Sequence, residues 1–537
     1  MAFLRIDKKD GDQYIRIVKS KRENGKPVQQ TVYSLGKVSD YTPEQLQRFG
    51  LKFYELGGGD PRELLEGSIE ELGRFNYGYY QLFKKIFSYY SLDKLMDRIK
   101  GKHDLDINLS NALMLMLVER LQQPSSKRQN YLNQQEYLGI ESIDLHHLYR
   151  TLDYLSMYSD QVQSFIYQPS RDLFNQELDV VFYDVTTFYF ESEIEIENAL
   201  RQKGFGKDGK IGSTQILFGL LIDRHKQPIG YRIYKGNFFE GHTFAQALSQ
   251  LKEQYNIKDI VVVADRGMLS KNNLQLTTGN NYEFIIGERL KTLPQGLKNH
   301  LLDINNYSKT WTYNHHDEAI VIRYCTINHE GRTIISTYSE KRAAKDRQDR
   351  EEKLETAQVL IKNPSVLKRK AHHYFLSTDQ NNQYHLNENK IKQSEQYDGF
   401  LAISTNAAKL TVEQILDNYR HLYQIEHSFR TFKSHLETRP MFHWTDKRIE
   451  GHICLCYIAY TLQTFVQNKL LNSGISLSEK QIRKAVDSMQ VSLIKNKDNQ
   501  FFLRSANKNH VDVIVNRMGL KKLPNVIPQK QITEYLK

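Results

Sequence analysis

DVVFYDVTTFYFES, residues 179–192, is the stretch that determines the predicted fold, and DIVVVADRG, residues 259–267, accompanies it. Both runs are rich in β-branched and aromatic residues, which favours buried β-strands. Asp184 lies inside the first run and Asp265 ends the apolar part of the second. A carboxylate at the end of a buried strand is unfavourable unless a cation or hydrogen-bond donors meet it. Two such strands in one sheet would place both carboxylates near its carboxyl edge, although each Asp alone is also typical of a cap or turn.

The segments that follow Asp184 predict a mixed α/β sheet. Residues 214–236 have the pattern of a β-hairpin, residues 243–255 that of a helix, and residues 282–289 that of a further strand. This order is typical of a mixed sheet with helices packed on it.

Residues 291–395 interrupt this pattern. The interruption begins with an antiparallel β meander, residues 309–339, and continues with a charged helix, residues 342–362. The sheet pattern resumes at residues 397–405. We therefore predict that residues 291–395 form a β-rich domain inserted into the sheet domain.

The N-terminal third combines a basic hairpin with a helical region. Residues 14–35 alternate as in a β-hairpin with an Asn24-Gly25 turn, and residues 66–175 are helical in pattern. The basic residues around the hairpin are Lys8, Lys9, Arg16, Lys19, Lys21, Arg22 and Lys26. They form either a solvated face or a contact with a DNA backbone. The helical region either forms an apolar helical bundle with a structural role alone or contains a DNA-binding helix-turn-helix.

Composition narrows the classes of partner. Lys and Arg number 74 against 63 Asp and Glu, and the net charge of +11 favours an anionic partner such as nucleic acid, or serves solubility alone. Three Cys are too few for a disulfide framework and indicate a reducing compartment. The most apolar run, residues 453–462, is too short to cross a bilayer and predicts a buried helix. We expect no membrane contact.

A third carboxylate, Glu426, lies in a segment predicted to be one long helix, residues 411–435. Tyr419, Glu426 and Lys433 are spaced seven residues apart, and each such step turns the side chain by only about 20° around an α-helix. Arg430 lies four residues after Glu426, near the same stripe. That spacing is also typical of a surface ion pair. An apolar stripe runs beside the polar one, so the polar stripe borders the buried side.

Asp184, Asp265 and Glu426 together suit hard divalent cations. Oxygen-rich ligand sets favour Mg²⁺, with Mn²⁺ as a substitute. Two such ions about 4 Å apart activate a water or a 3′-hydroxyl and stabilise the leaving oxygen at a phosphodiester. Basic residues beside Glu426 would hold the phosphate.

These motifs resemble those of the DDE transposases of bacterial insertion sequences. The resemblance rests on YDVTT around Asp184, ADRG around Asp265, and the helix with Tyr419, Glu426 and Lys433. It is narrowest to the branch with a Tyr-Arg-Glu-Lys signature and a β-rich insertion before the catalytic Glu. Further similar stretches are SLGKV at residues 34–38, ERLQQPSSK at 119–127, LYRTLDYL at 148–155 and RPMFHWTDKRIEGHICLCYIAY at 439–460. The resemblance covers nearly the whole chain.

The resemblance implies an α/β fold with an RNase H-like catalytic core. It implies cut-and-paste movement of an element bounded by terminal inverted repeats, with double-stranded DNA of the element ends and the target as partner. It also implies a homodimer on paired ends and a cytoplasmic, nucleoid-associated location. The two metal ions would be held by Asp184, which bridges both, by Asp265, which holds one, and by Glu426, which holds the other.

One position departs from the signature. The signature Arg, three residues after the Tyr, is Leu422 here. Arg420 and Arg430 lie nearby and are both candidate DNA contacts, and we expect Arg430 to replace the signature Arg and to contact phosphate together with Tyr419 and Lys433.

Trp311, inside the insertion, has two interpretations. Related enzymes can free the element through a DNA hairpin and stack a flipped base on a Trp of the insertion, which makes Trp311 a candidate DNA contact. A Trp on a β meander is also typical of a core.

Six domains are predicted from these patterns. They are a basic β-hairpin domain (1–60), a helical DNA-binding region (61–175), the first part of the RNase H-like core (176–290), a β-rich insertion (291–395), the second part of the core (396–475), and a C-terminal region that is a candidate for dimerisation (476–537).

Two other functions stay open. A catalytically inactive, transposase-derived protein would bind element ends without cutting them, although all three carboxylates are present. An aspartyl phosphotransferase is the other, because Asp184-Val185-Thr186 after an apolar strand loosely resembles the nucleophile strand of haloacid-dehalogenase-type phosphatases. Asp265-Arg266 does not supply the later acidic pair that those enzymes need.

Overall fold

The computed structural model describes most of the chain. The described residues are 2–23, 26–60, 69–173, 180–191, 194–205, 211–255, 260–279, 281–315, 318–362, 374–379, 383–439, 441–496, 499–508 and 510–536. The predicted Asn24-Gly25 turn lies outside them. The chain divides into two compact units, and each is described by itself. The first unit is Met1–Arg74, Ser492–Leu503 and Asn525–Lys530, and the second is Phe75–Val491, Arg504–Pro524 and Gln531–Lys537.

The first unit begins with a three-stranded antiparallel sheet. Its strands are β1 (Ala2–Lys9), β2 (Asp12–Glu23) and β3 (Lys26–Lys37), in that order. Helix α1 (Pro43–Leu56) follows, and the Thr42 hydroxyl accepts a hydrogen bond from the Gln45 backbone N–H at its start. The predicted hairpin is therefore β2 and β3, and the sequence analysis missed β1.

A second sheet of this unit corrects the helical prediction for residues 66–175 at its beginning. Its order is β19 (Val526–Pro528), β18 (Asn499–Arg504), β17 (Gln490–Asn496) and β4 (Ile69–Asn76). Thus Ile69–Asn76 is a strand. Its partner β17 lies more than 400 residues later in the sequence, so no local pattern could reveal the pairing.

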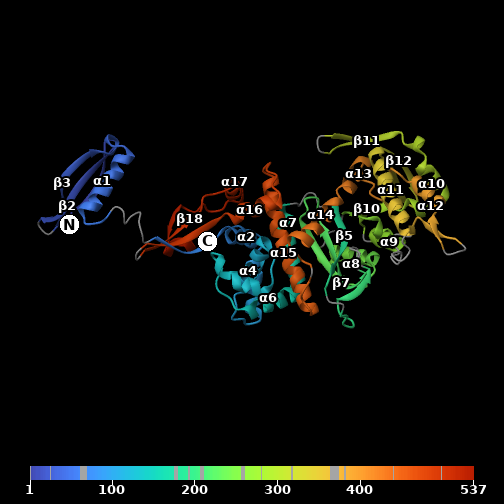
Figure 1. Cartoon of the computed structure of the whole chain (residues 1–537), viewed down its shortest axis with the longest axis horizontal. Helices are drawn as coiled ribbons and strands as arrows, with labels where there is room; N and C mark the ends of the chain where they lie inside the picture. Colours follow the sequence, from blue (N-terminus) through green and yellow to red (C-terminus); the bar gives the residue numbers. More distant parts are fainter. Residues whose placement is uncertain are drawn as a thin grey trace. The chain divides into compact units, whose positions relative to one another are not determined.

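A ten-stranded mixed sheet forms the centre of the second unit (Figure 1). Its order is β11-β12-β13-β16-β10-β9-β5-β7-β6, and β8 pairs with β7. The bounds are β5 (Val180–Tyr189), β6 (Gln202–Phe205), β7 (Ile211–Ile222), β8 (Pro228–Lys235), β9 (Val261–Ala264), β10 (Glu283–Glu288), β11 (Lys309–His315), β12 (Glu318–His329), β13 (Arg332–Tyr338) and β16 (Phe400–Thr405). Strands β5, β9 and β10 are parallel to one another, whereas β7 and β16 run antiparallel to their neighbours. The predicted mixed α/β fold is confirmed.

The β meander predicted for the insertion joins this same sheet. Strand β13 pairs with β16 from Thr333↔Thr405 to Tyr338↔Phe400. Helices α10 (Gln295–Leu302) and α11 (Glu340–Lys362) also belong to residues 291–395. The meander therefore extends the large sheet sideways, and the limits of the six predicted domains stay predictions.

Helices cover both faces of the sheet around β5. On one face, Val181, Tyr183 and Val185 share a core with Phe244 and Leu248 of α8 (Glu240–Glu253). On the other, the Phe218 ring of β7 lies 6.3 Å from the Phe429 ring and 5.1 Å from the Phe432 ring. Because side chains alternate along a strand, the even-numbered residues of β5 face the second layer.

A helical bundle completes the second unit. Its helices are α2 (Gly78–Tyr89), α3 (Leu92–Lys102), α4 (Leu109–Gln122), α5 (Lys127–Asn133), α6 (Leu145–Met157), α7 (Ser159–Leu173) and α15 (Asp446–Leu471). Residues 453–462 lie in α15 and are buried, as predicted. Helix α15 packs on α4 and α6 (Figure 1). Among the described residues, no helix is long and apolar enough to span a bilayer.

The long helix predicted for residues 411–435 is broken, which corrects that prediction. It consists of α13 (Val412–Arg420), α14 (Tyr423–Arg430) and the π-helical turn η9 (Thr431–His435). The break falls at His421 and Leu422, where the signature Arg was expected. The Leu422 and Ile425 N–H groups bond three residues back, to Tyr419 and Leu422, so the turn tightens locally. The seven-residue stripe of a regular α-helix therefore does not hold across the segment.

Candidate active site

Asp184 and Asp265 lie side by side on neighbouring parallel strands. In the register of β5 and β9, Tyr183 is opposite Ala264, so the next residues are Asp184 and Asp265. Parallel strands are about 4.8 Å apart, and side chains in register point to the same face. Both carboxylates therefore belong to one face of the sheet, and it is the face opposite the Val181 and Tyr183 core.

The position of Asp184 differs from the expected strand end. It is the fifth of ten residues in β5. Strand β9 ends at Ala264, whereas β5 continues to Tyr189. Asp184 is therefore level with the point where β9 ends. Because β9 does not continue past it, the Asp184 carboxylate is only half-buried, although most of β5 is buried. Asp184 Oδ1 accepts a hydrogen bond of 2.7 Å from the Val185 backbone N–H.

Glu426 comes from the helix that packs on this face. Helix α14 contacts β5 and buries Ile425 and Phe429, whereas the Glu426 side chain is exposed. The apolar residues of α14 thus fix the helix on the sheet, and Glu426 is carried on its solvent-accessible side.

The pKa of the Tyr419 hydroxyl depends on its burial and on the charged groups around it. Burial, together with smaller contributions from the negative charges of Asp265 and Glu426, raises the pKa of Tyr419 to about 12. Arg342 and Arg266 act in the opposite direction. Two of the three predicted acids therefore act electrostatically on the same hydroxyl, which stays protonated at neutral pH and can donate a hydrogen bond.

Gly287, which was not predicted from the sequence, leaves the space that this hydroxyl occupies. A Cβ on Gly287 in β10 would lie 2.4 Å from the Tyr419 hydroxyl oxygen and 3.1 Å from the Arg266 backbone nitrogen. Only a residue without a side chain allows Tyr419 to lie against the strand there. No sequence signal marks it, because Tyr419 is more than 130 residues away.

We expect Gly287→Ala to lower the DNA cleavage rate about tenfold or more, because the Tyr419 ring must shift away from Asp265. The measurement is single-turnover cleavage, with thermal unfolding as a check of the fold. Gly279→Ala is the matched control, since a Cβ there meets nothing within 4 Å. In a Tyr419→Phe background the Gly287→Ala effect should shrink. An undiminished effect there would show that Gly287 acts through another group.

Two cavities adjoin Tyr419. One, of about 430 Å³, is lined by Asp265, Arg266, Gly287 and Tyr419 among others. The other, of about 420 Å³, is lined by Trp311, Tyr313, Tyr419 and Arg420, together with Lys341, Arg342 and Lys345. Tyr419 and Arg342 line both cavities, so they lie between the two.

Trp311 therefore lies beside Tyr419 and Arg420. It is half-buried on β11, and its ring is 4.8 Å from that of Tyr313. The Arg420 guanidinium is 4.5 Å from the centre of the Tyr313 ring. A cation and two aromatic rings thus line one cavity, an arrangement that suits a nucleotide base and its phosphate.

Arg430 and Lys433 are placed differently. Arg430 is exposed and Lys433 half-buried, and neither is among the described residues that line these two cavities. Burial, together with smaller contributions from the charges of Lys226 and Arg430, lowers the pKa of His427 to about 4. The positive charge of Arg430 thus acts on His427, and Arg420, rather than Arg430, lines the cavity that also contains Trp311 and Tyr419.

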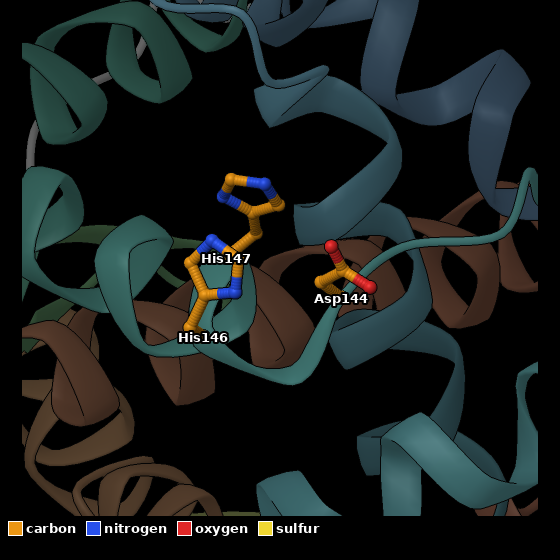
Figure 2. Close-up of side chains that lie close together, drawn as sticks. All are labelled: Asp144, His146 and His147. Atoms are coloured by element: carbon orange, nitrogen blue, oxygen red, sulfur yellow. The ribbon is translucent and has the colours of Figure 1, made fainter.

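The three predicted metal ligands are not drawn tightly together. Among the described residues, one group of three or more His, Cys, Asp or Glu side chains has ligand atoms within 4.8 Å of one another, and it is Asp144, His146 and His147 (Figure 2). Its two imidazole rings lie 3.8 Å apart at the start of α6. The positive end of a helix dipole opposes a cation there. Asp184 and Asp265 share one face of the sheet, Glu426 comes from the helix that packs on it, and carboxylate oxygens are the ligands that hard divalent ions prefer.

Comparisons with known proteins identify the family. The family model for the transposase DDE domain matches residues 175–462, more than half of the chain. The chain belongs to the DDE transposase family. The model for the N-terminal domain of IS1634 family transposases matches residues 4–50, which confirms the predicted likeness to an insertion-sequence transposase. The protein is thus a transposition enzyme that acts on DNA, and DDE transposases generally use divalent metal ions.

The other comparisons add little. No match was found among curated proteins. One solved structure with similarity is a cryo-EM structure of the piggyBac transposase synaptic complex with hairpin DNA. It is 8% identical, covers 76% of this chain and 78% of that chain, and has a TM-score of 0.35.

Proposed function

We propose that this transposase uses two divalent metal ions to cleave DNA strands at the ends of an insertion sequence and to join them to target DNA. The observation that carries the proposal is the placement of Asp184 and Asp265 in register on one face of the sheet. Helix α14 packs on that face and carries Glu426. Three acids from distant parts of the sequence thus lie around one region of the fold.

The strand order supports an RNase H-like core. In such a core, a three-stranded antiparallel meander is extended, beside its first strand, by two further strands parallel to that strand. The order β8-β7-β5-β9-β10 has this arrangement, with β5 as the first strand. Asp184 lies within β5 and Asp265 directly after β9, so both are beside the carboxyl end of β9.

We assign a separate role to each residue. Asp184, Asp265 and Glu426 would hold the metal ions, with Asp184 shared between them. When bound, Mg²⁺ or Mn²⁺ supplies a Lewis acid that lowers the pKa of the attacking water or hydroxyl and stabilises the leaving oxygen. Tyr419 donates a hydrogen bond from its protonated hydroxyl to a phosphate oxygen.

The cations around the site would position the DNA. Arg420 lies at a cavity wall with Trp311, where a phosphate and a base can be held together. Arg430 and Lys433 would contact the strand on the far side of Glu426. We further propose that the basic sheet β1–β3 contacts the terminal inverted repeats and that two copies act on paired ends.

A strand-cleavage assay tests this function. The substrate is a duplex that contains one element end, found as the imperfect inverted repeat flanking the reading frame, with each strand labelled in turn. Cleavage that leaves a 3′-hydroxyl at the element end is expected with Mg²⁺ or Mn²⁺ and not with excess EDTA. End binding without cleavage in either metal would identify an inactive DNA-binding protein, and cleavage that persists in EDTA would exclude the two-metal mechanism.

A further inference from the structure

A third cavity lies between the helical bundle and the segment that leads into α15. It measures about 430 Å³, the size range of small-ligand pockets. Its lining residues are Arg120, Pro124, Ser125, Ser126, Lys127, Tyr149, Glu437, Arg439, Phe442, His443, Trp444, Thr445, Arg448 and His452. Four of them are Lys or Arg, and Glu437 is the one carboxylate. This basic cavity is distinct from the two cavities at Tyr419.

Two of its cations are buried without a carboxylate partner in the part of the chain that the structure describes. Arg120 is 6% exposed, and its guanidinium donates to the backbone carbonyls of Leu436, Glu437 and Ser125. Its Nε has no hydrogen-bond partner among the described residues. Lys127 is buried and donates to the Asn130 side-chain oxygen. Glu119 acts on Lys127 electrostatically, but no ion pair joins the two among the described residues, and the Glu119 carboxylate accepts hydrogen bonds from Ser125, Asn130 and Tyr137. Buried cations without an ion-pair partner are unfavourable, so the retention of Arg120 and Lys127 indicates an anionic ligand.

The pKa values of the ionisable groups around the basic cavity are lowered, first by burial and then by nearby positive charges. Burial and then Arg120 lower the pKa of Lys127 to about 7. Burial lowers the pKa of His443 to about 4, and Lys127 and Arg120 add to the effect. Burial and Arg120 also hold the pKa of His452 well below its ordinary value. The two His are therefore neutral at pH 7 and Lys127 is only partly protonated, so most of the positive charge of the cavity comes from Arg120, Arg439 and Arg448. An anion bound beside Lys127 would favour its protonated form.

Aromatic side chains stand at the same cavity. Trp444 is 54% exposed and Phe442 is 73% exposed, although each is large and apolar. The guanidinium of Arg201, itself buried, lies 4.7 Å from the centre of the Trp444 ring. The Trp444 ring thus packs against the Arg201 guanidinium, while about half of its side chain stays accessible to solvent. An exposed ring beside a positive cavity is the combination with which proteins bind single nucleic-acid strands.

The basic cavity is linked to the strand that carries Asp184. The Met441 N–H donates to the carbonyl of Tyr189, the last residue of β5, and the Arg439 guanidinium lies 5.2 Å from the centre of the Tyr189 ring. Asp184 precedes Tyr189 by five residues, or about 17 Å of extended strand.

We propose that the basic cavity binds a backbone phosphate of an unpaired DNA strand and that Trp444 stacks an adjacent base. The proposal rests on the proposed function, because it assumes that DNA reaches the catalytic face. Unpaired DNA is the ligand because a base must leave its own stack to lie on a side chain. The subsite would hold a strand end beside the carboxylates during cleavage and joining.

Tryptophan fluorescence tests this directly, since the chain has only two Trp. Trp311→Phe leaves Trp444 as the single tryptophan. This variant is titrated with a fluorescein-labelled dT12 oligonucleotide and with a blunt 20-base-pair duplex, and anisotropy reports binding independently. We expect dT12 to quench Trp444 saturably over the concentrations at which anisotropy rises. Binding without quenching, or quenching by the duplex alone, would overturn the inference and leave the transposase function untouched.

Charge variants complete the test. Lys127→Met should weaken dT12 binding about fivefold, and Trp444→Ala about tenfold. Lys469→Met is the matched control, because Lys469 is exposed and lies 21 residues after Arg448 on α15, or about 31 Å along the helix. Its binding should stay within about twofold of the parent. Thermal unfolding checks each fold. Equal losses for Lys127→Met and Lys469→Met would show that only net charge matters and would contradict the subsite.

Discussion

Asp184→Asn should slow Mg²⁺-dependent cleavage of element-end DNA by about a thousandfold or more, a loss of about 4 kcal/mol of transition-state stabilisation. The amide keeps the size of the side chain but removes the negative charge that would hold both ions. The fold should survive, because Asp184 is half-buried and its Oδ1 acceptor is retained in the amide. DNA binding should be unchanged or tighter, since one negative charge near the phosphates is lost.

The control for this variant is Asp106→Asn, an identical change at an exposed residue before α4. Its cleavage rate should match that of the parent protein. The comparison uses single-turnover rates at saturating DNA, so that differences in binding do not enter. If Asp184→Asn cuts as fast as the parent, Asp184 is not a metal ligand.

Gly451→Ala should destabilise the second unit by about 3 kcal/mol. A Cβ on Gly451 in α15 would lie 2.0 Å from the carbonyl oxygen of Leu152 and 2.7 Å from its carbonyl carbon, both backbone atoms of α6. The helices cannot easily separate, because Leu148, Leu152 and Leu155 are fully buried. Thermal unfolding should shift down by several °C.

The expected loss of stability in Gly451→Ala is opposite to the usual effect of replacing Gly by Ala in a helix. Gly to Ala inside an exposed helix normally stabilises by up to about 1 kcal/mol. Gly101→Ala in α3 is the matched control, because nothing lies within 4 Å of a Cβ there and the residue is exposed. We expect Gly101→Ala to be neutral or stabilising. A Gly451→Ala protein as stable as the parent would mean that α6 and α15 are not packed backbone to backbone.

The sequence predicted those elements whose pattern is local. The apolar runs around Asp184 and Asp265 are strands, and residues 453–462 lie in a buried helix. Burial on one or both faces leaves a periodic or continuous apolar signal that a single segment displays. Strand β4 is different, because a partner far along the chain decides its conformation.

The sequence alone identified the candidate carboxylates, but not the residues and the helix break around them. Asp184 and Asp265 stand out as carboxylates in apolar runs. Gly287 has no such mark, since its role comes from the close approach of Tyr419. The break before α14 was missed because His421 and Leu422 are compatible with a helix. At the break, backbone N–H groups bond to carbonyls three residues back instead of four, and local helix propensity does not predict this change.

Arg420 illustrates the same limit. Helical spacing favoured Arg430 as the phosphate contact, because Arg430 follows Glu426 by one turn. The break in the helix changes the direction of the side chains before and after it. As a result, Arg420 lines a cavity with Trp311 and Tyr419, whereas Arg430 acts on His427. We therefore expect Arg420→Gln to slow strand cleavage more than Arg430→Gln does in the same assay.

The central claim is that Asp184, Asp265 and Glu426 hold a shared pair of metal ions. Anomalous scattering from Mn²⁺ in crystals of the protein bound to element-end DNA tests it most directly. The expected result is two Mn²⁺ peaks about 4 Å apart, with oxygen ligands from all three residues. Mn²⁺ bound elsewhere, with Glu426 more than a helix turn away from both aspartates in the DNA complex, would contradict it.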